Sequence, residues 1–357
     1  MNESFSDLSV LHEFETSEDY MPFIHSLQKS DEAITGNLYT SVCGGNTAST
    51  EFEFLTGNTM AFLPSGSVAY QQYISGNLPS FVTSLKNQGY ETIAMHPYNS
   101  TGWNRNKVYP YLGFDESYFR LDFPNAKILR KYVSDESICD KIIDTYENKS
   151  NNPLFCFAVT MQNHGGYSEI FDNFPISVTL NDIKNRPATE NYLSLVKESD
   201  RAFKELVDYF RNAHEDTIIL MFGDHQPNDY VANCIANLTG TNPEERSLKE
   251  QQNRYIVPFV LWANYDLDSK HDITTSVNYL NLYLSKAAGV NLSDYQQYLL
   301  KLQKEIPVIT ANMCIDSKGN FISDFNEVSD TLSLYKRLQY MYLFDGKHRD
   351  NSIFEVK

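Results

Sequence analysis

The feature that most constrains the fold is an apolar run that stops at an acid and an imidazole, residues 217–227, TIILMFGDHQP. Four strand-forming residues, Ile218–Met221, lead through Phe222 into Gly223, Asp224 and His225. Such a run is typical of a strand covered on both faces, and in open α/β sheets ligands gather outside the carboxyl ends of these strands. We therefore predict Asp224 and His225 as metal ligands. The alternative is that Gly-Asp-His only opens a turn.

Strand-like and helix-like segments alternate over the first 265 residues. The sequence predicts helices at 78–89 and 191–213 and strands at 92–95, 154–160, 217–222 and 255–262. This alternation predicts an α/β fold with a mostly parallel sheet sandwiched by helices. Beyond residue 265 it changes to helices at 277–288, 293–304 and 330–344 with hairpin strands within 306–323. We therefore expect a catalytic domain over residues 1–265 and a small C-terminal α+β subdomain over 266–357, packed on it.

Two further strands end at a histidine. His96 follows the strand at 92–95, and His164 follows the strand at 154–160. The loop after His96 carries Trp103 and Arg105. An arginine can bind phosphate oxygens through two nitrogens, and a tryptophan offers a flat apolar wall to a glycerol or a sugar. Taken alone, these two residues would more often make surface contacts.

A glycine-bounded helix start is the next candidate, within residues 43–57, CGGNTASTEFEFLTG. Gly44 and Gly45 permit a tight turn, after which Thr47 or Ser49 can cap a helix that ends at Gly57. The positive end of a helix suits a phosphoryl group and helps a hydroxyl to ionise beside a metal. The alternative is plain helix capping.

Charge and composition exclude several classes. The 46 acidic residues outnumber the 29 basic ones, and a net charge of -17 repels phosphate backbones, so nucleic acid is not expected as a partner. No run reaches the length of a transmembrane helix, and the first thirty residues lack the pattern of a signal peptide. The five cysteines contain no C-x-x-C pair and are interpreted mostly as buried apolar residues. The chain as given is expected to be soluble.

The chain opens on a carboxylate, Glu3, within Met1–Asp7. A ligand at a strand end needs a strand before it, and none precedes Glu3 in this sequence. We therefore expect a truncated start. The alternative is a frayed terminus in which Glu3 has no role.

The joint occurrence of these features is more informative than any one of them. Residues that can bind metal or phosphate follow the predicted strands at His96, His164 and Asp224–His225, and a helix starts at Thr47. Together they predict a metal-dependent phosphoryl-transfer site. A set of carboxylates, imidazoles and a hydroxyl suits Mn²⁺, Mg²⁺ or Zn²⁺.

Several segments, in order, resemble one known family. They are ES at 3–4, GGNTASTEFEFLTG at 44–57, MHPYNSTGWNRNKVYPYLGFDE at 95–116, TMQNHGGY at 160–167 and MFGDHQP at 221–227. They look like the extracellular domain of lipoteichoic acid synthases, which are phosphoglycerol transferases of the sulfatase/alkaline phosphatase superfamily. The resemblance covers about the first 265 residues and implies that superfamily's fold.

The resemblance also implies a reaction. Thr47 would be the nucleophile that takes phosphoglycerol from a phosphatidylglycerol-type lipid through a covalent threonine intermediate and passes it to a glycerol-phosphate or glycolipid acceptor. The product would be lipoteichoic acid or a related cell-envelope polymer, made at the extracellular face of the membrane, with membrane contact through segments absent from this chain. The implied Mn²⁺ ligands are Glu3, Thr47, Asp224 and His225, and the implied substrate-pocket residues are His96, Trp103, Arg105 and His164.

Some residues depart from the family pattern. Ala48 stands where the family has a serine, and Ser49 stands where an acidic residue is common. The stretch after Thr47 lacks the C/S-x-P-x-R setting of sulfatases that use formylglycine, so sulfate ester hydrolysis is disfavoured. The alternatives are a phosphoethanolamine transferase or phosphodiesterase of the same superfamily, or a catalytically dead module that binds an anionic polymer.

Overall fold

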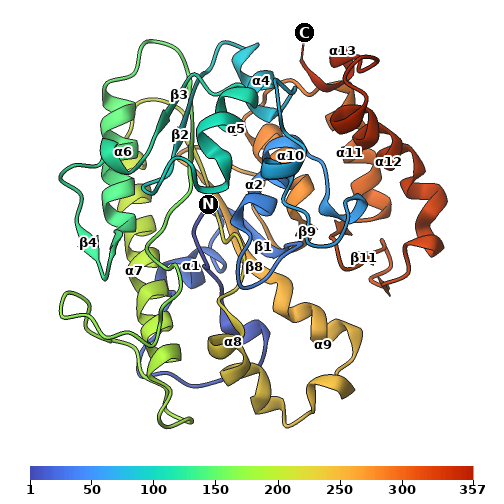
Figure 1. The fold of residues 1–357 in the computed structure, drawn as a ribbon. Coiled ribbons are helices and arrows are strands. Elements are labelled where there is room, and N and C mark those ends of the chain that lie inside the picture. The colour runs from blue at the N-terminus through green and yellow to red at the C-terminus, as the bar shows by residue number, and fades with distance from the viewer. Residues whose placement is uncertain (357) are drawn as a thin grey trace.

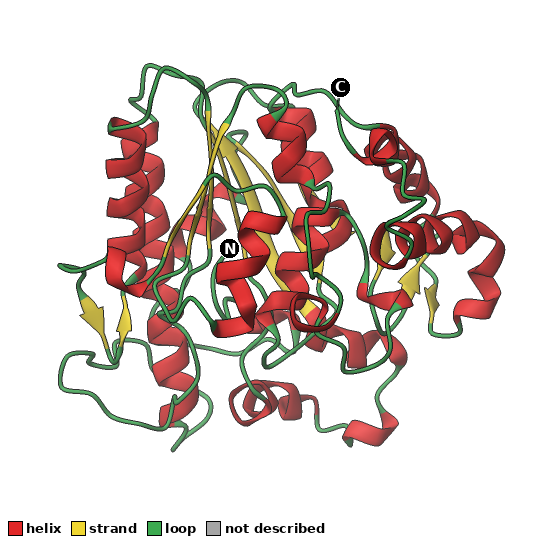
Figure 2. Ribbon diagram, turned by 45° about the horizontal axis from the view of Figure 1, so that its top comes forward, coloured by secondary structure: helices red, strands yellow, loops and turns green. Residues whose placement is uncertain are grey.

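The computed structural model describes residues 1–356 and shows two β-sheets side by side between layers of helices (Figures 1 and 2). The first sheet has the order β7-β8-β1-β9, and the second has the order β3-β2-β6. Their strands are β1 (Ala33–Tyr39), β2 (Glu91–Met95), β3 (Glu116–Tyr118), β6 (Leu154–Ala158), β7 (Ile218–Phe222), β8 (Ile256–Ala263) and β9 (Lys270–Ser276). The predicted α/β class, with central strands covered by helices, is confirmed.

The strand directions are mixed. β2 is parallel to both β3 and β6, and β1 is parallel to β9. β8, however, runs antiparallel to both β7 and β1. The segment between β7 and β8 stays at the end of the sheet where β7 finishes. β8 therefore starts at that end and runs in the opposite direction to β7. The alternating pattern predicted β8 but did not predict its direction.

The main helices pack their apolar faces on these sheets. They are α2 (Thr47–Thr56), α4 (Phe81–Lys86), α6 (Asp135–Glu147), α7 (Pro187–Phe210) and α10 (Val277–Ala287). The helix predicted at 191–213 lies within α7, and an apolar stripe along it, which includes Tyr192, Leu195 and Phe203, is buried. Phe54 of α2 lies between the sheets, with ring centroids 5.6 Å from Phe157 of β6 and 5.1 Å from Phe222 of β7. One aromatic core therefore links α2 to both sheets.

Smaller elements surround this centre. Among residues 1–356 they are α1 (Pro22–Leu27), α3 (Ala69–Gln72), α5 (Arg105–Tyr111), α8 (Asp229–Ala236), α9 (Leu248–Gln252), a hairpin of β4 (Ile128–Leu129) and β5 (Tyr132–Val133), and a C-terminal group of α11 (Asp294–Glu305), β10 (Val308–Ile309), β11 (Cys314–Ile315), β12 (Phe321–Ile322), α12 (Ser329–Phe344) and α13 (Asn351–Phe354). β9 and α10 follow residue 265, but both contact the earlier part of the chain. β9 pairs with β1, and Asn281 of α10 donates a hydrogen bond to Phe54 O in α2. The division into 1–265 and 266–357 stays a prediction. None of the helices within residues 1–356 is both long and apolar enough to cross a membrane.

The first three residues join the two sheets. The Met1 amino group donates to Ala158 O at the end of β6 (2.8 Å), and Asn2 N donates to Phe222 O at the end of β7 (2.8 Å). Asn2 and Gly223 form a parallel bridge. Beyond this junction a cavity of about 550 Å³ lies between β6 and β7 and is lined by residues of both strands. Glu3 is thus fixed at the carboxyl ends of both strands, and the alternative of a frayed terminus is wrong.

Candidate metal and phosphoryl site

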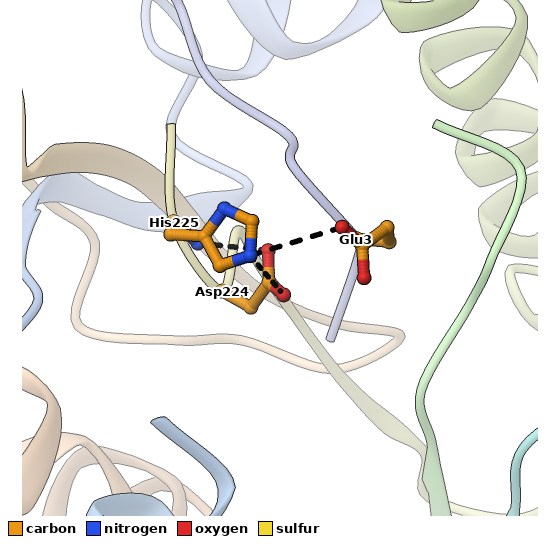
Figure 3. Close-up of side chains that lie close together, drawn as sticks. All are labelled: Glu3, Asp224 and His225. Carbon is orange, nitrogen blue, oxygen red and sulfur yellow. Dashed lines mark hydrogen bonds and ion pairs between the residues drawn. The ribbon is translucent and has the colours of Figure 1, made fainter. Parts of the chain in front are cut away.

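Glu3, Asp224 and His225 lie together at the carboxyl end of β7 (Figure 3). One ligand atom from each lies within 4.8 Å of the other two. His225 Nε2 is 3.2 Å from Asp224 Oδ2 and 3.7 Å from Glu3 Oε1. All three side chains are at most 5% exposed. The fold has therefore brought Glu3 to a pair that follows it by more than two hundred residues.

Local hydrogen bonds orient these side chains and leave two atoms free. Asp224 Oδ1 accepts from Ser4 N (2.6 Å) and from His225 N (2.8 Å). His225 Nδ1 is 2.8 Å from Gln226 O, so Nδ1 carries the proton and Nε2 presents a lone pair to the cluster. Asp224 Oδ2 and His225 Nε2 are buried and have no hydrogen-bond partner. Buried polar atoms without a partner call for an explanation, and a bound cation would supply one.

The charges in the cluster favour a cation. Burial raises the pKa of Asp224 to about 7, and Glu3 raises it further, while His225 opposes the shift. Two carboxylates this close repel each other in a buried site. A divalent ion would remove that repulsion, and two carboxylates with an imidazole form a donor set that such ions accept. The residues present therefore fit a metal.

Thr47 lies at the start of α2, beside this cluster. Its hydroxyl donates to Glu3 Oε2 at 3.3 Å. The N-cap of α2 is Asn46, which has left-handed backbone angles and makes no side-chain cap bond. The prediction that Thr47 or Ser49 caps this helix is wrong, because Thr47 is the first helical residue and its hydroxyl turns towards the acidic cluster. Thr50 ties the helix to β7 by donating to Asp224 O (2.7 Å).

His96 and Arg105 form a buried pair. His96 Nδ1 is 3.0 Å from Val159 O, which places the proton on Nδ1, and Arg105 Nη1 donates to His96 Nε2 at 3.0 Å. Burial, followed by the charge of Arg105, lowers the pKa of His96 well below its usual range, so this imidazole is neutral. Arg105 also pairs with Glu51 of α2, with Nη2 2.5 Å from Oε1.

Glu51 was not among the predicted site residues. Its signal in the sequence is its position one helical turn after Thr47, which puts both on one face of α2. Glu51 is fully buried, and Tyr109 Oη donates to its Oε2 at 2.8 Å. These bonds fix the guanidinium of Arg105, because a buried ion pair is stable only when its remaining lone pairs are satisfied.

His164 and Trp103 lie on loops. His164 is exposed, and its Nδ1 is 3.1 Å from Tyr132 Oη in β5. His164 also contributes, after burial and Arg105, to the lowered pKa of His96. Trp103 is half-buried, with left-handed backbone angles, just before α5. Thus Glu3, Asp224 and His225 form one cluster, Thr47 contacts Glu3, and His96 contacts Arg105, while the functional roles of all eight residues stay predictions.

Comparison with known proteins places the chain in a family. The family model described as Sulfatase matches residues 1–290. The chain is 33% identical to a Rhizobium meliloti (strain 1021) protein named for modification of cyclic beta-1,2-glucan, in an alignment of 363 positions that covers 99% of this chain and 56% of that relative. It is 26% identical to the lipoteichoic acid synthase of Staphylococcus saprophyticus, in an alignment of 221 positions that covers 58% of this chain and 32% of that protein.

Solved structures agree in fold. The phosphoglycerol transferase GacH of Streptococcus pyogenes, in complex with sn-glycerol-1-phosphate, superposes with a TM-score of 0.77 at 21% identity, over 100% of this chain and 88% of that one. The lipoteichoic acid synthase LtaP of Listeria monocytogenes superposes with a TM-score of 0.65 at 18% identity, over 95% and 89%.

The chain therefore shares an α/β fold with these structures, and its acidic cluster lies at the carboxyl ends of the strands. The chain belongs to the sulfatase family, and within it the chain is similar to lipoteichoic acid synthases. The predicted family resemblance is confirmed.

Proposed function

We propose that this domain is a metal-dependent phosphoglycerol transferase that uses Thr47 as its nucleophile and a phosphatidylglycerol-type lipid as its donor. The observation that carries the proposal is the contact of the Thr47 hydroxyl with Glu3, beside two buried ligand atoms of Asp224 and His225 that have no hydrogen-bond partner. The similarity to lipoteichoic acid synthases supports the lipid donor. GacH, which has the same fold, was solved with a glycerol phosphate bound.

In this proposal Glu3, Thr47, Asp224 and His225 hold a divalent ion, with Mn²⁺ as the first choice and Mg²⁺ or Zn²⁺ as alternatives. A bound ion would neutralise charge on the phosphoryl group and favour the ionised hydroxyl. The Thr47 hydroxyl loses its proton to solvent and Oγ1 attacks phosphorus, while the bond from phosphorus to the diacylglycerol oxygen breaks. Phosphoglycerol is left on Thr47, and the diacylglycerol oxygen takes up a proton and leaves as the free alcohol. Arg105, held by Glu51 and by His96, and the imidazole of His164 orient the phosphoryl oxygens and the leaving oxygen, while Trp103 forms an apolar wall for the glycerol.

The second half of the reaction transfers phosphoglycerol from Thr47 to an acceptor hydroxyl. We propose a glycerol-phosphate or glycolipid acceptor in the synthesis of a cell-envelope polymer. The relative named for modification of a cyclic glucan favours a second candidate, a soluble glycan acceptor. The reaction would take place at the extracellular face of the membrane.

The test is Thr47→Ala in the presence of Mn²⁺. We expect turnover of a phosphatidylglycerol analogue to fall by at least about a hundredfold, because the nucleophile is removed. The thermal unfolding curve should keep its cooperative shape. Mass spectrometry of the wild-type protein after mixing with the donor should show phosphoglycerol on Thr47. Unchanged turnover in the variant would contradict the proposal, and a preference for phosphatidylethanolamine would favour a phosphoethanolamine transferase.

A further inference from the structure

The loop that carries His164 is held by the β4–β5 hairpin, which lies about thirty residues earlier in the chain. The hairpin turns at Arg130 and Lys131, and Arg130 has a φ of 54°. A left-handed conformation is uncommon for a residue with a long side chain. It persists only where surrounding contacts hold it, so the contacts of Arg130 show what the turn does.

Arg130 fixes the backbone of the His164 loop. Its side chain is buried, and Nη2 donates to Gln162 O at 2.8 Å and to His164 O at 2.6 Å. The guanidinium lies over the rings of Tyr132 and Tyr167, at 5.7 and 5.6 Å from their centroids. Asn173 secures the hairpin in turn by donating to Arg130 O at 3.1 Å. A cation stacked between two rings with two carbonyl acceptors has little freedom to move.

Tyr132 fixes the ring of His164. Its Oη is 3.1 Å from His164 Nδ1, and the two ring centroids are 5.4 Å apart. Burial raises the pKa of Tyr132, so its hydroxyl keeps its proton. A phenol is a good donor and a weak acceptor, whereas an unprotonated imidazole nitrogen is a good acceptor. The bond therefore runs from Tyr132 Oη–H to Nδ1, and the proton of the neutral imidazole lies on Nε2.

A row of aromatic rings connects this pair to the buried part of the site. The ring of Tyr132 lies 6.2 Å from that of Tyr98, which lies 6.3 Å from that of His96. Glu3 also contributes to the raised pKa of Tyr132. His164 is thus presented at the rim of the site that contains Glu3 and His96.

We propose that Arg130 and Tyr132 are positioning residues for His164: Arg130 sets the backbone of its loop, and Tyr132 sets its ring orientation and its Nε2–H tautomer. The Nε2–H group is then a hydrogen-bond donor to an oxygen of the transferred phosphoryl group or of its leaving group. This role for Nε2–H depends on the proposed function, whereas the tautomer and the hydrogen bond do not. In other sites, the partner of a functional histidine sets which ring nitrogen carries the proton.

The test uses Tyr132→Phe, which keeps the ring and removes only the hydroxyl. In ¹⁵N spectra of histidine-labelled protein, with the His164 signals assigned by their loss in His164→Gln, the wild type should show a protonated Nε2 and an Nδ1 that accepts a hydrogen bond. Tyr132→Phe should shift the Nδ1 signal to that of a free acceptor. Its kcat on a phosphatidylglycerol analogue should fall about tenfold with little change in KM, the scale expected when the partner of a functional histidine is lost.

Three further variants complete the experiment. Tyr340→Phe, at an exposed position on α12, should leave both the spectrum and kcat unchanged. Arg130→Gln should lower kcat and broaden the His164 signals, and Arg130→Lys should restore the activity only in part, because a lysine cannot bind both carbonyls while stacked between two rings. A protonated Nδ1 in the wild type, or an unaltered spectrum and kcat in Tyr132→Phe, would overturn the inference. If Thr47→Ala stays active while the tautomer is as stated, the proposed function fails and the positioning of His164 stands.

Discussion

Two acidic residues of α2, Glu51 and Glu53, are both buried but have different partners. Glu51 is paired with Arg105, whereas Glu53 Oε1 accepts from Ser41 Oγ (2.7 Å), Met60 N (2.7 Å) and Thr59 Oγ1 (3.2 Å). Burial raises the pKa of Glu53 to about 7, and the three donors only oppose that shift. A buried carboxyl with neutral donors is easier to keep protonated than charged. Glu53 therefore stabilises the fold best when it is neutral.

This difference gives a pH prediction. Because the folded-state pKa of Glu53 is raised above its ordinary value of 4.5, its contribution is fully present below pH 4.5 and is lost as the pH rises through about 7. The loss is on the order of 3 kcal/mol by pH 8. Glu53→Gln, which stays neutral, should lose less unfolding free energy than the wild type between pH 5 and pH 8 in denaturant titrations. Glu305→Gln, at an exposed position, should follow the wild type; an equal pH dependence in Glu53→Gln would refute the assignment.

At the scale of the element, β7 is the strand that connects the core to the site. Its apolar residues pair with β8, and its end is joined to Met1–Glu3 through the bridge between Asn2 and Gly223. Gly223 permits this approach, because a Cβ at that position would lie 1.9 Å from Phe5 O. The placement of Glu3 therefore depends on a residue without a side chain at the end of β7.

Gly223→Ala should weaken metal binding as well as the fold. The added methyl group must displace the segment that contains Glu3, so the rise in melting temperature on adding Mn²⁺ should shrink or vanish. Gly36→Ala is a matched control: its Cβ would lie 2.1 Å from Ile273 O, within the sheet pair of β1 and β9. We expect Gly36→Ala to lower the melting temperature while keeping the Mn²⁺-induced rise. An undiminished Mn²⁺ effect in Gly223→Ala would rule out this dependence.

At the scale of the whole molecule, Met1–Glu3 join the two sheets at the carboxyl ends of β6 and β7. Along the rest of these two strands the cavity lies between the sheets. The cavity is lined by β6, by β7 and by aromatic residues such as Phe54 and Phe81. β6 pairs with β2 and β7 pairs with β8, but β6 and β7 do not pair with each other. Their facing backbone groups lack the sheet partners that β8 has on both sides.

This arrangement predicts uneven hydrogen exchange. In β6 (residues 154–158) and β7 (residues 218–222), alternate amides face the cavity. About half of the amides in peptides that cover these strands should therefore exchange well before the amides of β8 (residues 256–263). Residues 91–95 of β2, which has a neighbour on each side, are the internal control. Exchange measured by mass spectrometry at neutral pH tests this, and equal protection of β6, β7 and β8 would show that the facing edges are closed in solution.

What the sequence determined by itself is local. Hydrophobic periodicity and turn chemistry act over a few residues, so they can be read from the sequence. They predict the apolar run before Asp224, the apolar stripe on α7 and the histidines that follow β2 and β6. α6 and β9 were missed; Ser134, which caps α6, and Ile138 on its buried face were the available signals for the helix.

Tertiary structure decided which local pieces meet. It set the antiparallel direction of β8 and the position of Glu3 between the ends of β6 and β7. It also paired Arg105 with Glu51 and placed the β4–β5 hairpin where Arg130 binds the backbone of His164. Each of these depends on how distant segments fill one interior and satisfy each other's buried charges and backbone groups. That requirement acts across the whole chain, so the spacing of residues along the sequence does not record it.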